Sequence, residues 1–138
     1  MALTYLDIDR FKTINDSFGH AIGDEVLKRV AQRLVESVRA DDTVARLGGD
    51  EFTVILENLN TRSDALHAAE LMGERIRAEM PLGERAAMVT ISIGIAFFDP
   101  EAANSATLES TGKALIDAAD AALYQVKRRG RDGYYAAP

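Results

Sequence analysis

Apolar and polar positions alternate, or recur at helical spacing, in separate stretches along the chain. A short apolar run at 3–8 ends in acidic residues and predicts a buried strand. Apolar residues three and four positions apart then predict a helix over about 24–37, after a polar loop. Two short apolar runs, at 43–47 and 52–56, flank two glycines and two acids, and this pattern predicts a β-hairpin.

The middle of the chain predicts a second helix. Thr61 followed by Asp64 resembles a capping box, in which each side chain bonds the other residue's backbone at the start of a helix. The apolar stripe continues as far as Met80, and Pro81 is expected to end the helix there.

The last third predicts a strand, a helix and a short final strand. Large apolar residues alternate with smaller ones over 88–98, which predicts a longer strand in the middle of a sheet. A Ser, Asn and Thr-rich loop leads to a helix from about Lys113, with Gly130 at its end, and a terminal strand is expected near Tyr134. The order β, α, β, β, α, β, α predicts an α+β fold, an α/β sandwich whose helices cover a mixed sheet, in one domain over 1–138.

Composition narrows the chemistry. The absence of cysteine excludes disulfides and thiolate metal sites, so any metal must use oxygen or histidine ligands; it also fits a cytoplasmic location. No apolar run approaches the roughly 20 residues of a membrane span, so no membrane contact is expected. A net charge of −6 argues against a nucleic-acid surface, but it allows a small phosphorylated ligand that is bound through local cations or a metal.

Two groups of acids are candidate ligands. Asp7 and Asp9 end the first strand, where alternate residues face the same way, although pleating can break down there and only one need reach a ligand. Two solvated acids at a strand end are the simpler interpretation. In the hairpin turn, Gly48 and Gly49 let the backbone approach a phosphate, while Asp50 and Glu51 can supply a cation ligand and a base. An ordinary turn has the same composition.

Polar residues at two further places have both a functional and a structural interpretation. Asn15 with Asp24 can read a purine edge, whereas a loop and a helix N-cap explain the same residues. His20 is equally compatible with a structural loop position. Lys127 and Arg131 can bind phosphate, or they can complement the dipole at the end of the last helix.

Four segments together resemble the GGDEF family of diguanylate cyclases: LDIDRFKTINDSFGHAIGDEVL at 6–27, ARLGGDEF at 45–52, VTISIGIA at 89–96 and ADAALYQVKRRGRD at 119–132. The resemblance implies a ferredoxin-like βαββαβ core related to class III nucleotidyl cyclases, with a mixed or antiparallel central sheet. It also implies an enzyme that condenses two GTP into cyclic di-GMP and two pyrophosphates at a homodimer interface. Some relatives are catalytically silent and instead bind GTP or cyclic di-GMP to regulate a neighbouring domain.

The resemblance also implies residue roles. Asp7 and Asp50, with the Ile8 carbonyl and Glu51, are expected to hold Mg²⁺, for which Mn²⁺ can substitute. Asp50 and Glu51 are the catalytic acids, and Lys12 stabilises charge on the phosphate side. The expected nucleotide contacts are Asn15 and Asp24 on guanine, His20 in the pocket wall, the turn glycines Gly48 and Gly49, and Lys127 with Arg131 on the terminal phosphates.

The same resemblance implies product inhibition and further domains in the parent protein. Arg39 and Asp42, which a five-residue spacer separates from the turn, resemble the RxxD site at which product inhibits related cyclases, although a polar helix-to-strand connection also explains them. The family's usual leading helix is lacking here, so the chain is expected to be a fragment or to lack that helix. Asp132 stands where Asn is usual. The expected partners are a transient second copy of the chain and fused sensory or phosphodiesterase domains. The parent protein that contains them can be anchored in a membrane.

Overall fold

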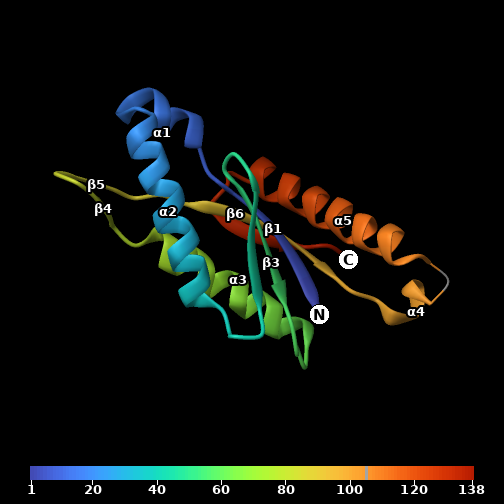
Figure 1. Cartoon of the computed structure of the whole chain (residues 1–138). Coiled ribbons are helices and arrows are strands. Elements are labelled where there is room, and N and C mark those ends of the chain that lie inside the picture. The colour runs from blue at the N-terminus through green and yellow to red at the C-terminus, as the bar shows by residue number, and fades with distance from the viewer. Residues whose placement is uncertain (105) are drawn as a thin grey trace.

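A five-stranded sheet forms the middle layer of the computed structural model, which describes residues 1–104 and 106–138 (Figure 1). The strand order is β2-β3-β1-β6-β7, with antiparallel neighbours except for the parallel pair β6 and β7. A mixed sheet was predicted from the order of elements, and it is confirmed. The strands are β1 (Ala2–Ile8), β2 (Thr43–Gly48), β3 (Glu51–Leu56), β6 (Ile91–Phe97) and β7 (Gly133–Ala136).

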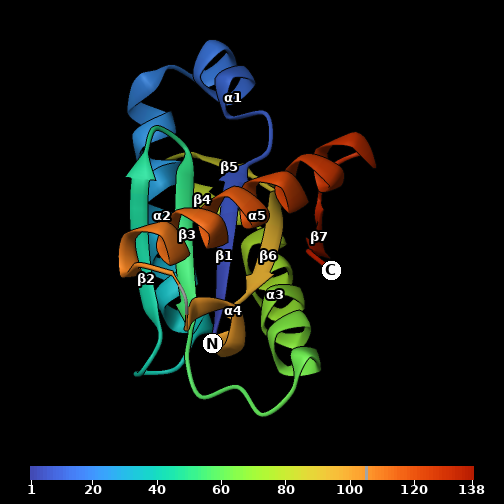
Figure 2. The same ribbon diagram turned by 90° about the vertical axis from the view of Figure 1, so that its right-hand side faces the viewer.

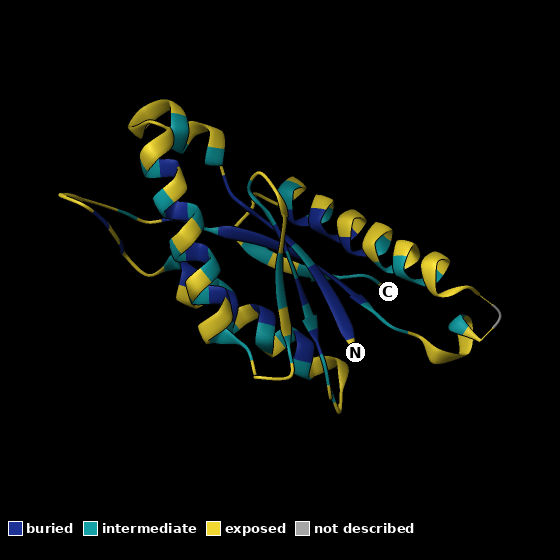
Figure 3. Ribbon diagram, in the orientation of Figure 1, coloured by how far each residue is buried: buried dark blue, intermediate teal, exposed yellow. Residues whose placement is uncertain are grey.

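Helices cover both faces of the sheet. In Figure 2, α5 (Leu108–Arg128) crosses one face, while α2 (His20–Ser37) and α3 (Arg62–Arg77) lie behind the other. The central strands β1 and β6 are therefore buried almost throughout (Figure 3). Alternate side chains of β1 serve the two layers: Leu6 and Ile8 pack with α2 and α3, whereas Leu3 and Tyr5 pack with α5.

The predicted capping box is confirmed at the start of α3. The hydroxyl of Thr61 accepts a hydrogen bond from the Asp64 backbone, and the Asp64 carboxylate accepts bonds from the backbone of Thr61 and Asn60. The Asp64 pKa lies below its usual range, chiefly because these backbone N–H groups favour the charged carboxylate.

Two helix boundaries differ from the sequence prediction. The polar loop before position 24 is helical instead, because α1 (Phe11–Phe18) folds there and packs Phe11 and Ile14 onto the core. Gly19, with φ of 88°, separates α1 from α2, which starts four residues earlier than expected. The last helix also starts earlier, at Leu108, where the Thr107 hydroxyl caps it; the short α4 (Pro100–Ala103) precedes it.

A small hairpin replaces the predicted end of the second helix and start of the following strand. Met80 belongs to β4 (Met80–Leu82), which pairs with β5 (Arg85–Ala87), rather than to the helix. The chain leaves α3 three residues before Met80, since Ala78 is already extended. The long strand likewise begins at Ile91 instead of Met88, whereas the terminal strand near Tyr134 is confirmed as β7.

Arg33 of α2 closes the end of α3. Its guanidinium donates to the carbonyls of Ile76, Ala78 and Glu79 at 3.2, 2.7 and 2.8 Å. A cation at a helix C-terminus complements the dipole and satisfies carbonyls that lack helical partners. We expect Arg33→Ala to lower the free energy of unfolding by about 1–2 kcal/mol in urea titrations. Arg29→Ala, one turn earlier, is the control, and an equal loss there would contradict the capping role.

Candidate active site

The turn between β2 and β3, with Gly48, Gly49, Asp50 and Glu51, contacts the C-terminal end of β1. Asp7 lies opposite Glu51 in the β1–β3 register, and the Ile8 N–H donates to the Asp50 carbonyl at 3.2 Å. Two carboxylates from different strands therefore reach one edge of the sheet. The turn itself needs glycine, because Gly48 and Gly49 have φ of 145° and 51°.

Among residues 1–104 and 106–138, Asp7 has one carboxylate oxygen without a hydrogen-bond partner. Its side chain is 9% exposed, and Oδ2 forms an ion pair with Lys127 Nζ from the last turn of α5. Oδ1 is buried and accepts no hydrogen bond from the described residues. Burial raises the pKa of Asp7, and Lys127 opposes that shift. An unpartnered buried acceptor is costly, so this oxygen is available for a ligand.

Tyr5 is a site residue that the sequence did not single out. Its hydroxyl donates to Glu51 Oε2 at 3.1 Å, which fixes the orientation of that carboxylate. Burial, followed by the nearby Glu51 charge, raises the pKa of Tyr5 to about 12, so the hydroxyl stays a donor at neutral pH. The signal in the sequence was its position two residues before Asp7, which places both side chains on the α5 face.

The donor set suits a hard divalent cation only in part. Asp7, the Ile8 carbonyl and the acids of the turn offer oxygen, which such ions prefer. Within 1–104 and 106–138, however, no three acidic, histidine or cysteine side chains gather closely enough to hold a metal by themselves. A cation here needs further oxygens, and substrate phosphates commonly supply them.

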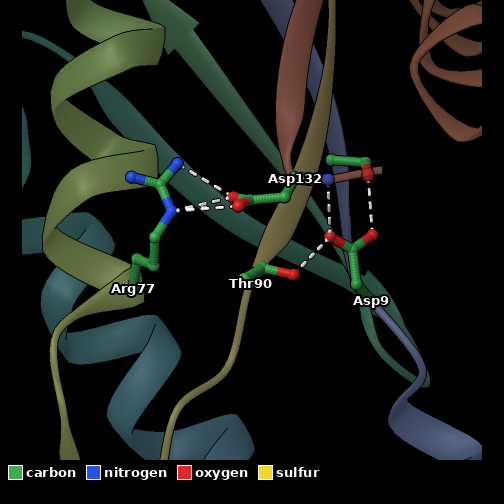
Figure 4. A network of polar contacts seen from close by, with 5 residues as sticks. Asp9, Arg77, Thr90 and Asp132 are labelled. Atoms are coloured by element: carbon green, nitrogen blue, oxygen red, sulfur yellow. Dashed lines mark hydrogen bonds and ion pairs between the residues drawn. The ribbon is translucent and has the colours of Figure 1, made fainter. Parts of the chain in front are cut away.

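Asp9 does not join this group, although the sequence placed it beside Asp7. Its carboxylate accepts hydrogen bonds from Thr90, Ser92 and the Asp132 backbone (Figure 4). The pleat of β1 ends at Ile8, so the two acids diverge. Among the described residues, both Asp9 oxygens therefore accept hydrogen bonds, whereas Asp7 Oδ1 accepts none.

A second unpartnered acceptor lies between α1 and α2. Asn15 Oδ1 is buried and without a hydrogen-bond partner among the described residues. Gly23 makes room for it, since a Cβ atom on Gly23 would lie 1.8 Å from that oxygen. Asp24 is exposed in α2, whose N-cap is Gly19, so the expected N-cap role of Asp24 is wrong. Lys12 and His20 are exposed nearby on α1 and α2.

The end of α5 returns to the same edge of the sheet. Lys127 reaches Asp7 there, while Arg131 follows in the connection to β7 with an exposed side chain and a φ of 69°. Both predicted phosphate contacts therefore lie near the strand end that carries Asp7, although only Lys127 touches it.

Arg39 and Asp42 lie away from this edge, beside a hollow of about 230 Å³ that His67 and Asp64 also line. The Asp42 carboxylate accepts hydrogen bonds from the backbone of Arg39 and of Glu57, each at 2.9 Å. Asp42 thus stabilises the connection between α2 and β2, which is the structural role that the sequence left open. Arg39 is exposed at the rim of the hollow.

Comparisons with known proteins agree over nearly the whole chain. Residues 1–133 match the family model described as "Diguanylate cyclase, GGDEF domain". Among curated relatives, the diguanylate cyclase TpbB of Pseudomonas aeruginosa is 42% identical over 132 residues. The bifunctional diguanylate cyclase/cyclic di-GMP phosphodiesterase MucR of the same species is 39% identical over 133 residues. These alignments cover 95% and 96% of this chain, but it spans only 29% and 18% of the relatives' lengths.

Solved structures give the same result. The crystal structure of the TpbB GGDEF domain superposes with a TM-score of 0.89 at 40% identity, covering 99% of this chain and 81% of that one. The GGDEF domain of DgcB from Caulobacter crescentus, crystallised with c-di-GMP, gives a TM-score of 0.85 at 31% identity and covers 99% and 77%. None of the described helices is long and apolar enough to cross a membrane.

Proposed function

Because the chain belongs to the GGDEF family of diguanylate cyclase domains, we propose that it condenses two GTP molecules into cyclic di-GMP. The observation that carries this proposal is the unpartnered, buried Asp7 oxygen beside the Asp50–Glu51 turn. A phosphoryl-transfer site needs such preorganised acceptors where a cation and a triphosphate meet. The matching relatives, named as diguanylate cyclases, support the same chemistry.

Each half-reaction forms one bond and breaks one. The 3′-hydroxyl oxygen of one GTP attacks the α-phosphorus of the other, the bond to the β-phosphate oxygen breaks, and pyrophosphate leaves. The hydroxyl proton passes to an acid of the turn, Asp50 or Glu51. A second, reciprocal transfer closes the ring, so two copies of the domain face each other with one GTP each.

A divalent metal belongs to this proposal, as Mg²⁺ or as the substitute Mn²⁺. Asp7, the Ile8 carbonyl, Asp50 and Glu51 would hold it together with phosphate oxygens. When bound, the metal supplies neutralisation of the phosphate charge and a lowered hydroxyl pKa. Tyr5 keeps Glu51 directed toward this edge.

The remaining site residues would contact either the guanine base or the triphosphate of GTP. The buried Asn15 oxygen can accept from the guanine amino group, and Asp24 can accept from its ring N–H, with His20 beside them in the wall of the pocket. Lys12, Lys127 and Arg131 offer cations to the triphosphate, and the Gly48–Gly49 backbone lets it come close. GTP in the cytoplasm is the substrate, and fused sensory or phosphodiesterase domains supply the input.

The proposal is tested by incubating the chain with GTP and MgCl₂ and separating the products by chromatography. Cyclic di-GMP with two pyrophosphates per product supports it. GTP that binds but is recovered unchanged at all protein concentrations would instead identify a silent regulatory module. A rate that rises with the square of protein concentration would support the facing pair of domains.

We also propose that cyclic di-GMP binds at Arg39 and lowers turnover. The exposed guanidinium can present its planar fork to phosphate or guanine beside the hollow. Arg39→Ala is expected to weaken cyclic di-GMP binding by about tenfold in calorimetry and to relieve inhibition, while basal GTP consumption is unchanged. Unchanged affinity in both Arg39→Ala and Asp42→Ala would exclude this site.

A further inference from the structure

Asp9 is a buried acid that the proposed chemistry does not use. Its residue is 6% exposed, and its carboxylate accepts from Ser92 Oγ at 2.6 Å, from Thr90 Oγ1 at 2.7 Å and from the Asp132 N–H at 3.0 Å. Its own N–H donates to the Thr90 carbonyl at 2.9 Å. Three donors on one carboxylate fix its position, and they come from around the start of β6 and from the loop before β7 rather than from β3.

The segment that Asp9 holds has an unfavourable backbone. Between α5 and β7, Arg131 and Asp132 both have left-handed conformations, with φ of 69° and 49°. Residues with a side chain adopt this region only where contacts hold them there. The Asp132 N–H donates to Asp9, and the Arg131 N–H donates to the Val126 carbonyl at 3.0 Å.

Asp132 also contacts Arg77, and this contact holds the loop less firmly than the hydrogen bond to Asp9 does. Its carboxylate accepts from Arg77 Nη2 at 2.8 Å and from Arg77 Nε at 3.0 Å (Figure 4). Both side chains are more than a third exposed, so water screens this pair. Asp9 is buried, and it therefore provides the firm attachment of the loop to the end of β1.

This attachment links the loop to the candidate site. Lys127, in the turn of α5 before the loop, pairs with Asp7, which lies two residues before Asp9. We propose that Asp9 is a positioning residue whose carboxylate, through the Asp132 backbone, sets Arg131 against the terminal phosphates of GTP. The proposal rests on the proposed function.

The first test compares Asp9→Ala with Asp9→Asn. Asp9→Ala is expected to raise the KM for GTP about tenfold while kcat changes less than about threefold, because a charge-assisted phosphate contact is misplaced. Asp9→Asn is expected to restore the KM, since its amide oxygen can replace Oδ2 and accept from Asp132 and Thr90, while its NH₂ group replaces Oδ1 and donates to the Ser92 hydroxyl. An Asp9→Asn protein as inactive as a metal-ligand mutant would overturn the proposal, because charge rather than hydrogen bonding would then be needed.

A binding measurement separates positioning from catalysis. With 3′-deoxy-GTP, which cannot react, the affinity of Asp9→Ala is expected to fall about tenfold, while guanosine, which has no phosphate, binds as before. Arg131→Ala should lower the affinity for 3′-deoxy-GTP by the same factor. The variant that carries both Asp9→Ala and Arg131→Ala should bind no more weakly than Arg131→Ala alone, because both changes remove the same contact. Additive losses would show that Asp9 does not act through Arg131.

Hydrogen exchange provides a structural readout. The Asp132 amide should exchange slowly in the unchanged chain and in Asp9→Asn, and quickly in Asp9→Ala. If Asp9→Ala does not fold, Thr90→Val replaces it, since it removes a donor to the same Oδ2 atom; an unchanged KM there would then count against the proposal. Failure of the unchanged chain to bind 3′-deoxy-GTP would contradict the proposed function, whereas normal binding by every Asp9 variant would contradict only this inference.

Discussion

Asp50→Asn is expected to lower cyclic di-GMP formation on the order of a thousandfold or more while the thermal midpoint stays unchanged. Asp50 is only half-buried, and its side chain makes no hydrogen bond among the described residues. Its contribution to the fold is the carbonyl that accepts from Ile8, which the substitution keeps. Asparagine has the same shape but loses the charge that a cation and a developing phosphate charge require.

Steady-state product formation and a thermal melt, measured on the same preparation, check this expectation. Glu74→Gln removes an exposed acid on α3, on the other side of the sheet, and serves as the matched control with near-normal activity. Near-normal turnover by a folded Asp50→Asn protein would overturn the assignment of the turn as the catalytic centre.

Gly23→Ala is expected to lower kcat/KM for GTP about a hundredfold and to reduce the preference for GTP over ATP. The added Cβ would lie 1.8 Å from Asn15 Oδ1 and 2.9 Å from Asn15 Cγ, so the Asn15 side chain must move away. A site built to hydrogen-bond a base loses discrimination when one of its polar groups is displaced. The fold should survive, because alanine favours the helix by about 1 kcal/mol over glycine.

The control is Gly112→Ala in α5, where an added Cβ meets nothing within 4 Å. It makes the same chemical change inside a helix and should leave both nucleotides' kinetics unchanged. Rates with GTP and with ATP are measured for both variants. If Gly23→Ala keeps its GTP preference, Asn15 is not a reader of the base, whatever the state of the catalytic turn.

The sequence by itself determined the elements whose signals are local. Glycines at positions of positive φ predicted the turn between β2 and β3, and the capping box fixed the start of α3. The acidic strand end and the two candidate acids after the glycines were also visible, because strand and turn chemistry depend on neighbouring residues. These features were enough to name the candidate acids, but the register of β1 and β3 brought Asp7 and the turn together.

Helix α1 escaped prediction for a tertiary reason. Its residues are mostly polar, and none is buried. The spacing of Phe11, Ile14 and Phe18 is helical, but the Thr, Asn, Asp and Ser residues between them favour turns, and the packing of Phe11 and Ile14 on the core offsets that preference. The close approach of α1 and α2, where Gly23 leaves room for the Asn15 side chain, was hidden with it.

The alternation of positions did not decide which acid is free; the family resemblance implied Asp7, and the tertiary structure gives the physical reason. In sequence, Asp7 and Asp9 are equivalent members of one alternating pattern. In the described part of the fold, Lys127 pairs with one Asp7 oxygen and the other has no partner, whereas Thr90, Ser92 and Asp132 donate to Asp9. The physical reason is that hydrogen-bond partners come from segments distant in sequence, so the availability of a carboxylate is settled only when the sheet and α5 meet.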